Sequence, residues 1–367
     1  MTKTMLSIQQ ETLSVPGYKK VIKVDDESTG LKAIIAIHDL TLGPALGGIR
    51  IYPYADFDSA LKDVLRLSRG MTYKAAIAGC GLGGGKSVII ANPKTGEKTE
   101  QLLEAFAHVV DSLRGEYVCA EDVGCSTKDV EIISKITPYV VGLEHEKSSG
   151  DPSYFTAWGT YLGIKKSWKF LTGSDSLAGL KILVQGLGAV GEKLVEWLFW
   201  EQAEVLISDV DLSKVKVLQK RFGFEFVDPQ HVYEADCDIF SPCAMGGIIN
   251  QTSISTLKCK LVAGCANNQL LEEKDDTRLL NSGILYAPDF VINAGGLINV
   301  SIEIKKQGYN SAVARDAVAK IPLRLETIYN LARSNNIGTQ AAALILAEER
   351  IQKGIDKRVE PPVFHHQ

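Results

Sequence analysis

The sequence predicts an α/β protein of two domains, and its length, composition and order of apolar segments support this. The chain has 367 residues, which at about 100–200 residues per domain fits two domains. Hydrophobic residues make up 45% of the chain and charged residues 23%, an ordinary balance for a globular protein. In the second half, short apolar strands alternate with helices, a pattern typical of a parallel sheet covered on both faces.

The second half carries the more regular pattern of elements. Apolar, β-branched runs predict strands over residues 181–185, 204–208, 237–240 and 261–263, with a further extended stretch over 285–293. Apolar residues at helical spacing predict helices over 189–200 and 212–222, a helical region over 294–335 and a last helix over 340–353. These elements make up the predicted second domain.

The first half mixes strands and helices less regularly. Strands are predicted over 31–37, 87–91 and 117–120, and an amphipathic helix over 102–113. Another helix is predicted to follow Asp58 as its cap and to run to about Arg69. The turn-forming stretch 148–152 (SSGDP) predicts the boundary between a first domain over 1–147 and a second domain over 148–335.

Composition excludes several classes of partner and location. Lys and Arg number 40 against 44 Asp and Glu, so the chain lacks the basic surplus typical of nucleic-acid binders. The seven cysteines form no CxxC pair and the histidines have no zinc-site spacing, which favours reduced thiols in the cytoplasm and no metal. No apolar run approaches the ~18 residues of a membrane span, and the first residues do not resemble a secretory signal.

A dinucleotide-binding motif lies between the first predicted strand and helix of the second domain. It follows the strand KILVQ, opens the next helix and consists of Gly186, Leu187, Gly188, Ala189, Val190 and Gly191. Its glycines allow a tight turn, a close approach of the backbone to a pyrophosphate, and close packing of the helix on the strand. Asp209 ends the next strand, where its carboxylate would bind ribose hydroxyls and repel a 2′-phosphate. The motif therefore predicts NAD rather than NADP.

A second glycine-rich stretch, GCGLGGGKS over 79–87, resembles a phosphate-binding P-loop only in part. The position five residues before Gly85 is Cys80 rather than glycine. The residues after Lys86 predict a strand, whereas a P-loop must open a helix so that the helix N-terminus faces the phosphate. We therefore do not expect this stretch to bind ATP.

Two lysines of the first half, Lys74 and Lys86, have two interpretations. Most lysines are solvated surface charges. A lysine enclosed in an apolar site beside a second cation instead loses its proton easily and becomes a general base. One of the two lysines could then hold a substrate carboxylate while the other acts as a neutral base. Asp122, which follows a short strand with Glu121, could supply the balancing carboxylate.

Motifs along most of the chain resemble the amino-acid dehydrogenases, most closely their leucine/phenylalanine/valine branch. The resemblance extends from about Leu31 to Arg350. It rests on GPALGGIR (43–50), RGMTYK (69–74), LGGGKS (82–87), AEDVG (120–124), VQGLGAVG (184–191), PCAMGGIIN (242–250), AGCANNQL (263–270) and APDFVINAGGLINV (287–300). It implies NAD-dependent oxidative deamination of an L-amino acid to a 2-oxo acid, ammonium and NADH.

The resemblance also implies roles for individual residues. Lys74 would bind the substrate carboxylate with backbone groups of Gly47 and Gly48. Lys86 would be the general base, and Asp122 would exchange protons with the substrate nitrogen. Substrate and nicotinamide would be oriented by Asn268, while the cofactor would also be lined by Thr156, Ala244, Met245 and Asn267. The pocket for the substrate side chain would be built from Leu46, Leu297 and Val300, with Ile49, Cys80 and Gly81 near it.

The fold implied by the resemblance has an N-terminal α/β domain for substrate binding and oligomerisation, and a Rossmann NAD-binding domain separated from it by a cleft. Residues 336–367 would pack back onto the first domain, and the chain would form a homo-oligomer, a dimer or an octamer. The aliphatic pocket favours leucine, valine and isoleucine as substrates, because it offers no cation for a glutamate side chain. Two alternatives remain: an aromatic (phenylalanine or tryptophan) dehydrogenase, and a nucleotide-binding regulator without catalysis.

Overall fold

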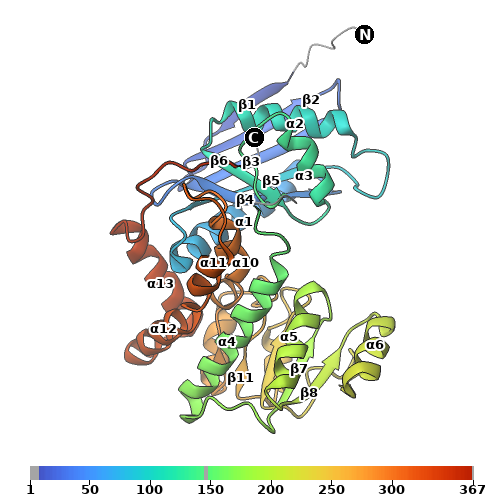
Figure 1. The fold of residues 1–367 in the computed structure, drawn as a ribbon, viewed down its shortest axis with the longest axis vertical. Coiled ribbons are helices and arrows are strands. Elements are labelled where there is room, and N and C mark those ends of the chain that lie inside the picture. Colours follow the sequence, from blue (N-terminus) through green and yellow to red (C-terminus); the bar gives the residue numbers. More distant parts are fainter. Residues whose placement is uncertain (1–7, 144–147, 366–367) are drawn as a thin grey trace. The chain divides into compact units, whose positions relative to one another are not determined.

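The computed structural model describes residues 8–143 and 148–365 (Figure 1). The described residues divide into two compact units, which we treat separately. The first comprises the described parts of Met1–Asp151, Val300–Ser311 and Glu348–Gln367, and the second comprises Pro152–Asn299 and Ala312–Ala347. Each unit is built on its own sheet with helices, so the α/β fold predicted from the sequence is confirmed.

The units differ in three places from the sequence-based ranges, which place 148–335 in one domain and 336–367 in the other. Residues 148–151 belong to the first unit, so the second unit begins at Pro152. Val300–Ser311 lies in the first unit, where the Glu303 carboxylate accepts hydrogen bonds from the backbone N–H groups of Gly142 (3.1 Å) and Ser149 (2.7 Å). Residues 336–347 lie in the second unit, where the Asp276 carboxylate accepts from the N–H groups of Gln340 and Ala341.

The first unit contains a six-stranded mixed sheet in the order β1-β2-β3-β5-β4-β6. Its strands are β1 (Gln9–Leu13), β2 (Lys20–Asp26), β3 (Leu31–Asp39), β4 (Ala45–Tyr52), β5 (Gly83–Ile90) and β6 (Tyr117–Glu121). Neighbours from β1 to β5 are antiparallel, whereas β4 runs parallel to both β5 and β6. Strand β6 ends with Glu121 beside Ile49 of β4, which in turn pairs with Ser87 in the middle of β5.

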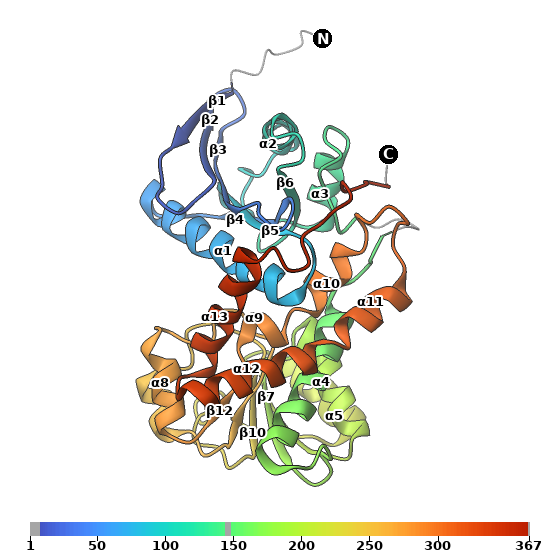
Figure 2. The ribbon, with the colours of Figure 1, turned by 90° about the vertical axis from the view of Figure 1, so that its left-hand side faces the viewer.

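Helix α1 (Phe57–Ala78) covers one face of this sheet, and α2 (Glu100–Ser112) and α3 (Thr127–Ser134) cover the other (Figure 2). The predicted α2 is confirmed within two residues. Helix α1 is capped by Asp56 rather than Asp58, and it runs well past Arg69 because the apolar stretch up to Ala78 is buried. It ends at Gly79, whose φ of 63° suits glycine. The longer helix brings Lys74 into the packed region.

Strand β5 begins at Gly83, earlier than predicted, and its second glycine, Gly84, packs directly against α1. A Cβ atom at Gly84 would lie 2.1 Å from the backbone nitrogen of Thr72. Glycine therefore lets β5 and α1 approach to backbone contact, which places Lys86 and Lys74 on the packed side of both elements. Because Lys86 lies within the strand, the stretch 79–87 is not a P-loop.

The second unit contains a parallel six-stranded sheet in the order β9-β8-β7-β10-β11-β12. Its strands are β7 (Lys181–Gln185), β8 (Glu204–Ser208), β9 (Glu225–Phe226), β10 (Ile239–Pro242), β11 (Leu261–Val262) and β12 (Leu285–Tyr286). Numbered from its own first strand, this is the order 3-2-1-4-5-6 of a Rossmann sheet. Strands β7 and β8 and helices α5 (Ala189–Trp200) and α6 (Leu212–Phe222) match the predicted bounds.

The remaining helices are α4 (Ser153–Thr172), α7 (Gln251–Thr256), α8 (Lys274–Asn281), α9 (Asp289–Ile292), α10 (Gly295–Ser301), α11 (Ser311–Val318), α12 (Ile321–Asn335) and α13 (Thr339–Gln352). The extended stretch predicted over 285–293 is wrong beyond Tyr286, because Pro288 ends the strand and α9 follows. No element is predicted from the sequence over the residues of helix α4. This helix carries Gly159 and Gly163 against Ile321 and Ile292, so its packing surface is not a simple apolar stripe.

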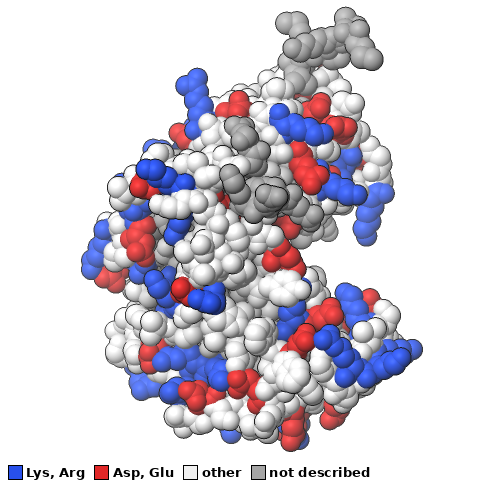
Figure 3. Space-filling model, viewed as in Figure 1, with Lys and Arg blue, Asp and Glu red and all other residues white. Residues whose placement is uncertain are grey.

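Charged side chains are interspersed over the face of the molecule shown in Figure 3, with Lys and Arg beside Asp and Glu. Among the described residues, no helix has the length and apolar character that a membrane crossing requires. The same residues contain no group of three or more His, Cys, Asp or Glu side chains placed to hold a metal ion.

We expect Gly84→Ala to destabilise the first unit and to separate Lys74 from Lys86, because the added methyl would overlap the Thr72 backbone. Overpacking of this kind costs about 1–3 kcal/mol or more. Urea denaturation monitored by circular dichroism measures the loss. Gly70→Ala is the matched control, since Gly70 lies in α1 with open space at its Cβ position and alanine there adds helix propensity. Equal stability of the two variants would contradict the packing role of Gly84.

Candidate active site

An ion pair between the buried Lys86 and the half-buried Asp122 forms the centre of the first unit's site. Lys86 is only 6% exposed in β5, and its Nζ atom contacts Oδ2 of Asp122, which follows β6. Gly48 of β4 lies between them. A Cβ atom there would be 2.7 Å from the Asp122 Cβ and 3.2 Å from the Lys86 Nζ. Only glycine at position 48 leaves room for this pair, which explains one glycine of the Gly47–Gly48 motif.

Burial lowers the pKa of the Lys86 ammonium to about 7, because the low-dielectric surroundings disfavour its charged form. The Arg50 guanidinium and, to a lesser extent, the Lys74 ammonium act in the same direction, whereas the Asp63 carboxylate opposes them. Lys74 is half-buried on α1 and close enough for its charge to act on Lys86. Lys86 therefore has the proton affinity that a general base needs near neutral pH.

Arg50 is a member of this cluster that the sequence analysis did not select. Its guanidinium donates through Nη1 to Oδ2 of Asp63 (2.9 Å) and lies 3.7 Å through Nη2 from Oδ2 of Asp122. The hydroxyl of Tyr54 donates to the same Asp63 oxygen (2.7 Å). A signal for Arg50 exists in the sequence: it is a charge between Ile49 and Ile51 of a buried strand, two positions after Gly48 and so on the same face.

The other residues expected around the substrate side chain lie in β4, just after α1, and in α10. Leu46 is buried in β4, two positions before Gly48. Ile49 was expected near the substrate, but it belongs to the core under α2, because strand alternation turns it to the opposite face of β4. The backbone carbonyls of Cys80 and Gly81 accept hydrogen bonds from the Arg358 guanidinium. Leu297 and Val300 are both buried in α10.

The glycine motif of the second unit joins β7 to α5 at the carboxyl end of the sheet. Gly186 has a φ of 100°, and a Cβ atom there would lie 2.6 Å from the Cβ of Ala244. A Cβ atom at Gly191 would lie 1.9 Å from the carbonyl oxygen of Gly186, so the turn and helix touch directly. Gly188 is the N-cap residue of α5 and has open space at its Cβ position. These features make a cradle for a phosphate at the N-terminus of the helix.

Asp209 lies beside this cradle. Its carboxylate accepts hydrogen bonds from the backbone N–H groups of Leu187 (2.6 Å) and Asp211 (2.8 Å). The contact with Leu187 ties the end of β8 to the glycine turn. An acidic group in this position suits the hydroxyls of a ribose better than a phosphate.

Ala244 and Met245 follow β10 beside the same turn and are exposed. The backbones of Asn267 and Asn268 approach Gly246, where a Cβ atom would lie 2.6 Å from the Asn267 carbonyl oxygen. Asn268 has a φ of 52°, which is uncommon for a residue other than glycine. Thr156 lies in the first turn of α4, where its Oγ1 would be 2.7 Å from a Cβ at Gly296 of α10.

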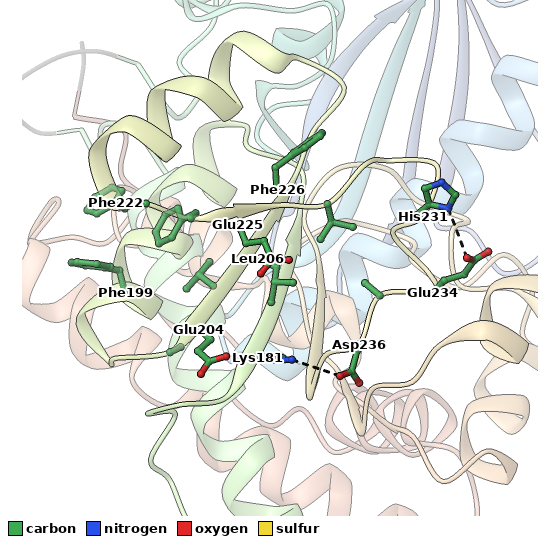
Figure 4. A pocket seen from close by; sticks show the side chains of 16 residues that line it. Lys181, Phe199, Glu204, Leu206, Phe222, Glu225, Phe226, His231, Glu234 and Asp236 are labelled. Atoms are coloured by element: carbon green, nitrogen blue, oxygen red, sulfur yellow. Dashed lines mark ion pairs between the residues drawn. The ribbon is translucent and has the colours of Figure 1, made fainter.

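A hollow of about 720 Å³ in the second unit does not coincide with the predicted cofactor residues. Its lining includes the first residues of three strands, Lys181 of β7, Glu204 of β8 and Glu225 of β9 (Figure 4). The glycine turn lies at the carboxyl ends, as expected for ligands of a parallel sheet. Ion pairs between Lys181 and Asp236 and between His231 and Glu234 border the hollow.

Comparison with known proteins identifies the family. A model described as "Glu/Leu/Phe/Val dehydrogenase, dimerisation domain" matches residues 18–139, and one described as "Glutamate/Leucine/Phenylalanine/Valine dehydrogenase" matches residues 207–358. The chain is 47% identical to a leucine dehydrogenase of Geobacillus stearothermophilus over 91% of both chains. It is 46% identical to an L-tryptophan dehydrogenase of Nostoc punctiforme over 93% of this chain and 95% of that protein.

The fold is likewise similar to the crystal structure of L-tryptophan dehydrogenase from Nostoc punctiforme, with a TM-score of 0.81 and 44% identity. That match covers 92% of this chain and 97% of the solved chain. Both domains of the relatives are thus represented here, and the lysine–aspartate pair and the glycine turn lie within the matching fold. The chain belongs to the glutamate/leucine/phenylalanine/valine dehydrogenase family of amino-acid oxidoreductases.

Proposed function

We propose that the protein catalyses the reversible, NAD-dependent oxidative deamination of branched-chain L-amino acids to 2-oxo acids, ammonium and NADH. The observation that carries the proposal is the buried Lys86, whose pKa is near neutrality beside Asp122 and a second lysine. A solvated surface lysine would have no such environment. The strong similarity to a leucine dehydrogenase supports the choice of substrate class.

Each residue of the first unit's cluster has a part in the proposed reaction. Lys74, the more exposed of the two lysines, binds the substrate α-carboxylate with the backbone of Gly47 and Gly48. Neutral Lys86 removes a proton from the water that attacks the imino acid. Asp122 exchanges protons with the substrate nitrogen, and its negative charge offsets the cations around it. The contact between Lys86 and Asp122 supports this division of labour.

The second unit fits NAD at the glycine turn. The open space at Gly188, the N-terminus of α5 and the carboxylate of Asp209 suit a pyrophosphate and a ribose. Leu187, Ala189, Val190, Ala244, Met245, Thr156 and Asn267 complete the proposed cofactor residues, and Asn268 would orient the substrate. When bound, NAD supplies the acceptor for the hydride from the substrate Cα.

Leucine, valine and isoleucine are the proposed substrates because Leu46, Leu297 and Val300 are aliphatic and buried. An aromatic amino acid, tryptophan or phenylalanine, is the second candidate, favoured by the 46% identity to an L-tryptophan dehydrogenase. The match to a dimerisation domain supports a homo-oligomer, a dimer or an octamer. All seven cysteines are free thiols, in keeping with a cytoplasmic protein.

Replacing each lysine separates their roles. We expect Lys86→Ala to lower kcat by about 10²–10⁴-fold, because the general base is lost, while NADH binding persists. In the parent, kcat/KM for deamination should rise with pH through about 7 and level off above it, since Lys86 acts only when neutral. Lys74→Ala should chiefly raise KM for the amino acid. Initial rates followed as NADH absorbance test both variants, and a Lys86→Ala enzyme within a few-fold of the parent would remove Lys86 from the mechanism.

The cofactor preference depends on the carboxylate at position 209. We expect the parent to prefer NAD, because Asp209 repels a 2′-phosphate and binds ribose hydroxyls. Asp209→Ala should narrow the preference for NAD over NADP, mainly by raising KM for NAD. Because this carboxylate also holds the Leu187 N–H group, Asp209→Asn is the control that keeps an acceptor without the charge. A parent enzyme that prefers NADP would contradict the assignment.

The substrate side chain is tested by kcat/KM across leucine, valine, isoleucine, phenylalanine, tryptophan and glutamate. We expect the three branched amino acids to be used and the aromatic ones to be weaker. Glutamate should be poor, because its second carboxylate finds no cation among Leu46, Leu297 and Val300. A higher kcat/KM for phenylalanine or tryptophan than for leucine would contradict the branched-chain substrate assignment, while the proposed reaction type would stand. Absence of NADH formation with every amino acid would instead indicate a regulator without catalysis.

A further inference from the structure

We propose that Arg50, held in place by Asp63, is a positioning residue that fixes Asp122 beside Lys86 and supplies the permanent positive charge that keeps Lys86 ready to act as a base. The inference rests on the proposed function, which it deepens by adding a residue outside the lysine–aspartate set. It concerns the first unit alone, and every contact in the argument lies within that unit.

The first step of the argument is the shared carboxylate oxygen. The Oδ2 atom of Asp122 contacts the Lys86 Nζ and lies 3.7 Å from Nη2 of Arg50, so one oxygen faces two cations. The other oxygen, Oδ1, accepts a hydrogen bond from the backbone N–H of Val123 (2.6 Å). The Asp122 side chain is therefore held from three directions, and its negative charge is divided between Arg50 and Lys86.

The second step is the way in which Arg50 itself is held. Asp63 of α1 accepts from Arg50 at 2.9 Å, from the Tyr54 hydroxyl at 2.7 Å and from the Arg66 guanidinium at 3.2 Å. Although burial raises the pKa of the Asp63 carboxyl, these partners bring it below its ordinary value. Asp63 is thus a stable anion near neutral pH. The Asp63 carboxylate therefore anchors the Arg50 guanidinium of β4 to helix α1. The Arg50 side chain is only 23% exposed.

The third step concerns charge. A guanidinium remains protonated at any pH at which proteins are folded, whereas a lysine ammonium in the same place could titrate with its neighbours. After burial, Arg50 is the strongest influence that lowers the pKa of Lys86, ahead of Lys74. Asp122 in contact with Lys86 favours its ammonium form, and Arg50 counters that effect by drawing on the same carboxylate. The groups that face Lys86 from the surrounding elements are Arg50 of β4, Asp63 and Lys74 of α1, and Asp122 and Cys125 after β6.

The test is the pH dependence of kcat/KM for oxidative deamination of leucine in Arg50→Gln. Without the guanidinium, Lys86 holds its proton more strongly, so the acidic limb of the profile should move to higher pH by about one unit or more. Arg50→Lys, which retains a cation, should show a smaller shift. KM for leucine should change little compared with Lys74→Ala, because Arg50 is not proposed to contact the substrate.

A matched control and a second variant keep the test sharp. Arg66→Gln removes a cation from the same Asp63 carboxylate, but from the exposed side, and should leave the acidic limb in place. If Arg50→Gln fails to fold because Asp63 is left buried without its main partner, the double variant Arg50→Gln/Asp63→Asn replaces both charges by neutral amides. Its acidic limb should also move to higher pH, by less than in the single variant, because the opposing influence of Asp63 is removed as well.

Acetylation of Lys86 by acetic anhydride, quantified by mass spectrometry across pH, measures the proton affinity of this lysine independently of catalytic activity. The labelling midpoint should rise in Arg50→Gln and stay unchanged in Arg66→Gln. A parent that oxidises no amino acid would refute the proposed function, and the labelling would still decide the link between Arg50 and Lys86. A lower kcat with an unchanged acidic limb and an unchanged labelling midpoint would overturn the proposal, because Arg50 would then be structural only.

Discussion

Burial of the Lys86 ammonium against the Asp122 carboxylate is the interaction on which the rest of the first unit's site depends. Removing the Lys86 ammonium from water carries a large desolvation cost, which an unpaired buried charge would leave uncompensated. The desolvation energy is offset here by several surrounding charges and not by the Lys86–Asp122 contact alone. Arg50 and Asp63 extend the pair, so that cations and anions alternate from Lys86 through Asp122 and Arg50 to Asp63.

Glycine is the residue that makes this arrangement sterically possible. Gly84 lets β5 touch the backbone of α1, and Gly48 leaves the space that the lysine and the aspartate occupy. At Gly47, a Cβ atom would lie 1.8 Å from the carbonyl oxygen of Gly85 in the neighbouring strand. Glycine runs that look like a phosphate-binding loop in the sequence are therefore packing elements in this unit. Their function is to bring charged side chains together inside a sheet-and-helix core.

In the second unit the same residue type has a different task. Gly186 adopts a backbone conformation that other residues avoid, Gly191 permits contact between turn and helix, and Gly188 leaves open space before α5. The distinction between the two glycine clusters follows from the element that comes next. A helix after the glycines directs N–H groups toward an anion, whereas a strand after them directs those groups to neighbouring strands.

The sequence by itself determined the elements with a clear period and the site residues that lie in dense local motifs. Strands β7 and β8 and helices α5 and α6 could be predicted because each is bounded by turn residues and has one apolar pattern. The glycine turn and Asp209 followed from spacing along the chain. Lys74, Lys86 and Asp122 were selected by family resemblance, since their isolated sequence positions are equally compatible with solvated charges.

Only the tertiary structure decided which charges meet. Arg50 and Asp63 are separated by a turn and the start of α1, and Asp122 follows β6, which comes much later in the chain. The parallel pairing of β4 with β5 and β6 makes them neighbours, and no local pattern encodes that pairing. The structure also shows Ile49 in the core rather than near the substrate. Helix α1 extends past Arg69, because burial against the sheet outweighs weak local helix propensity. Local periodicity is a property of short segments, whereas the proton affinity of Lys86 arises from charges that only folding brings together.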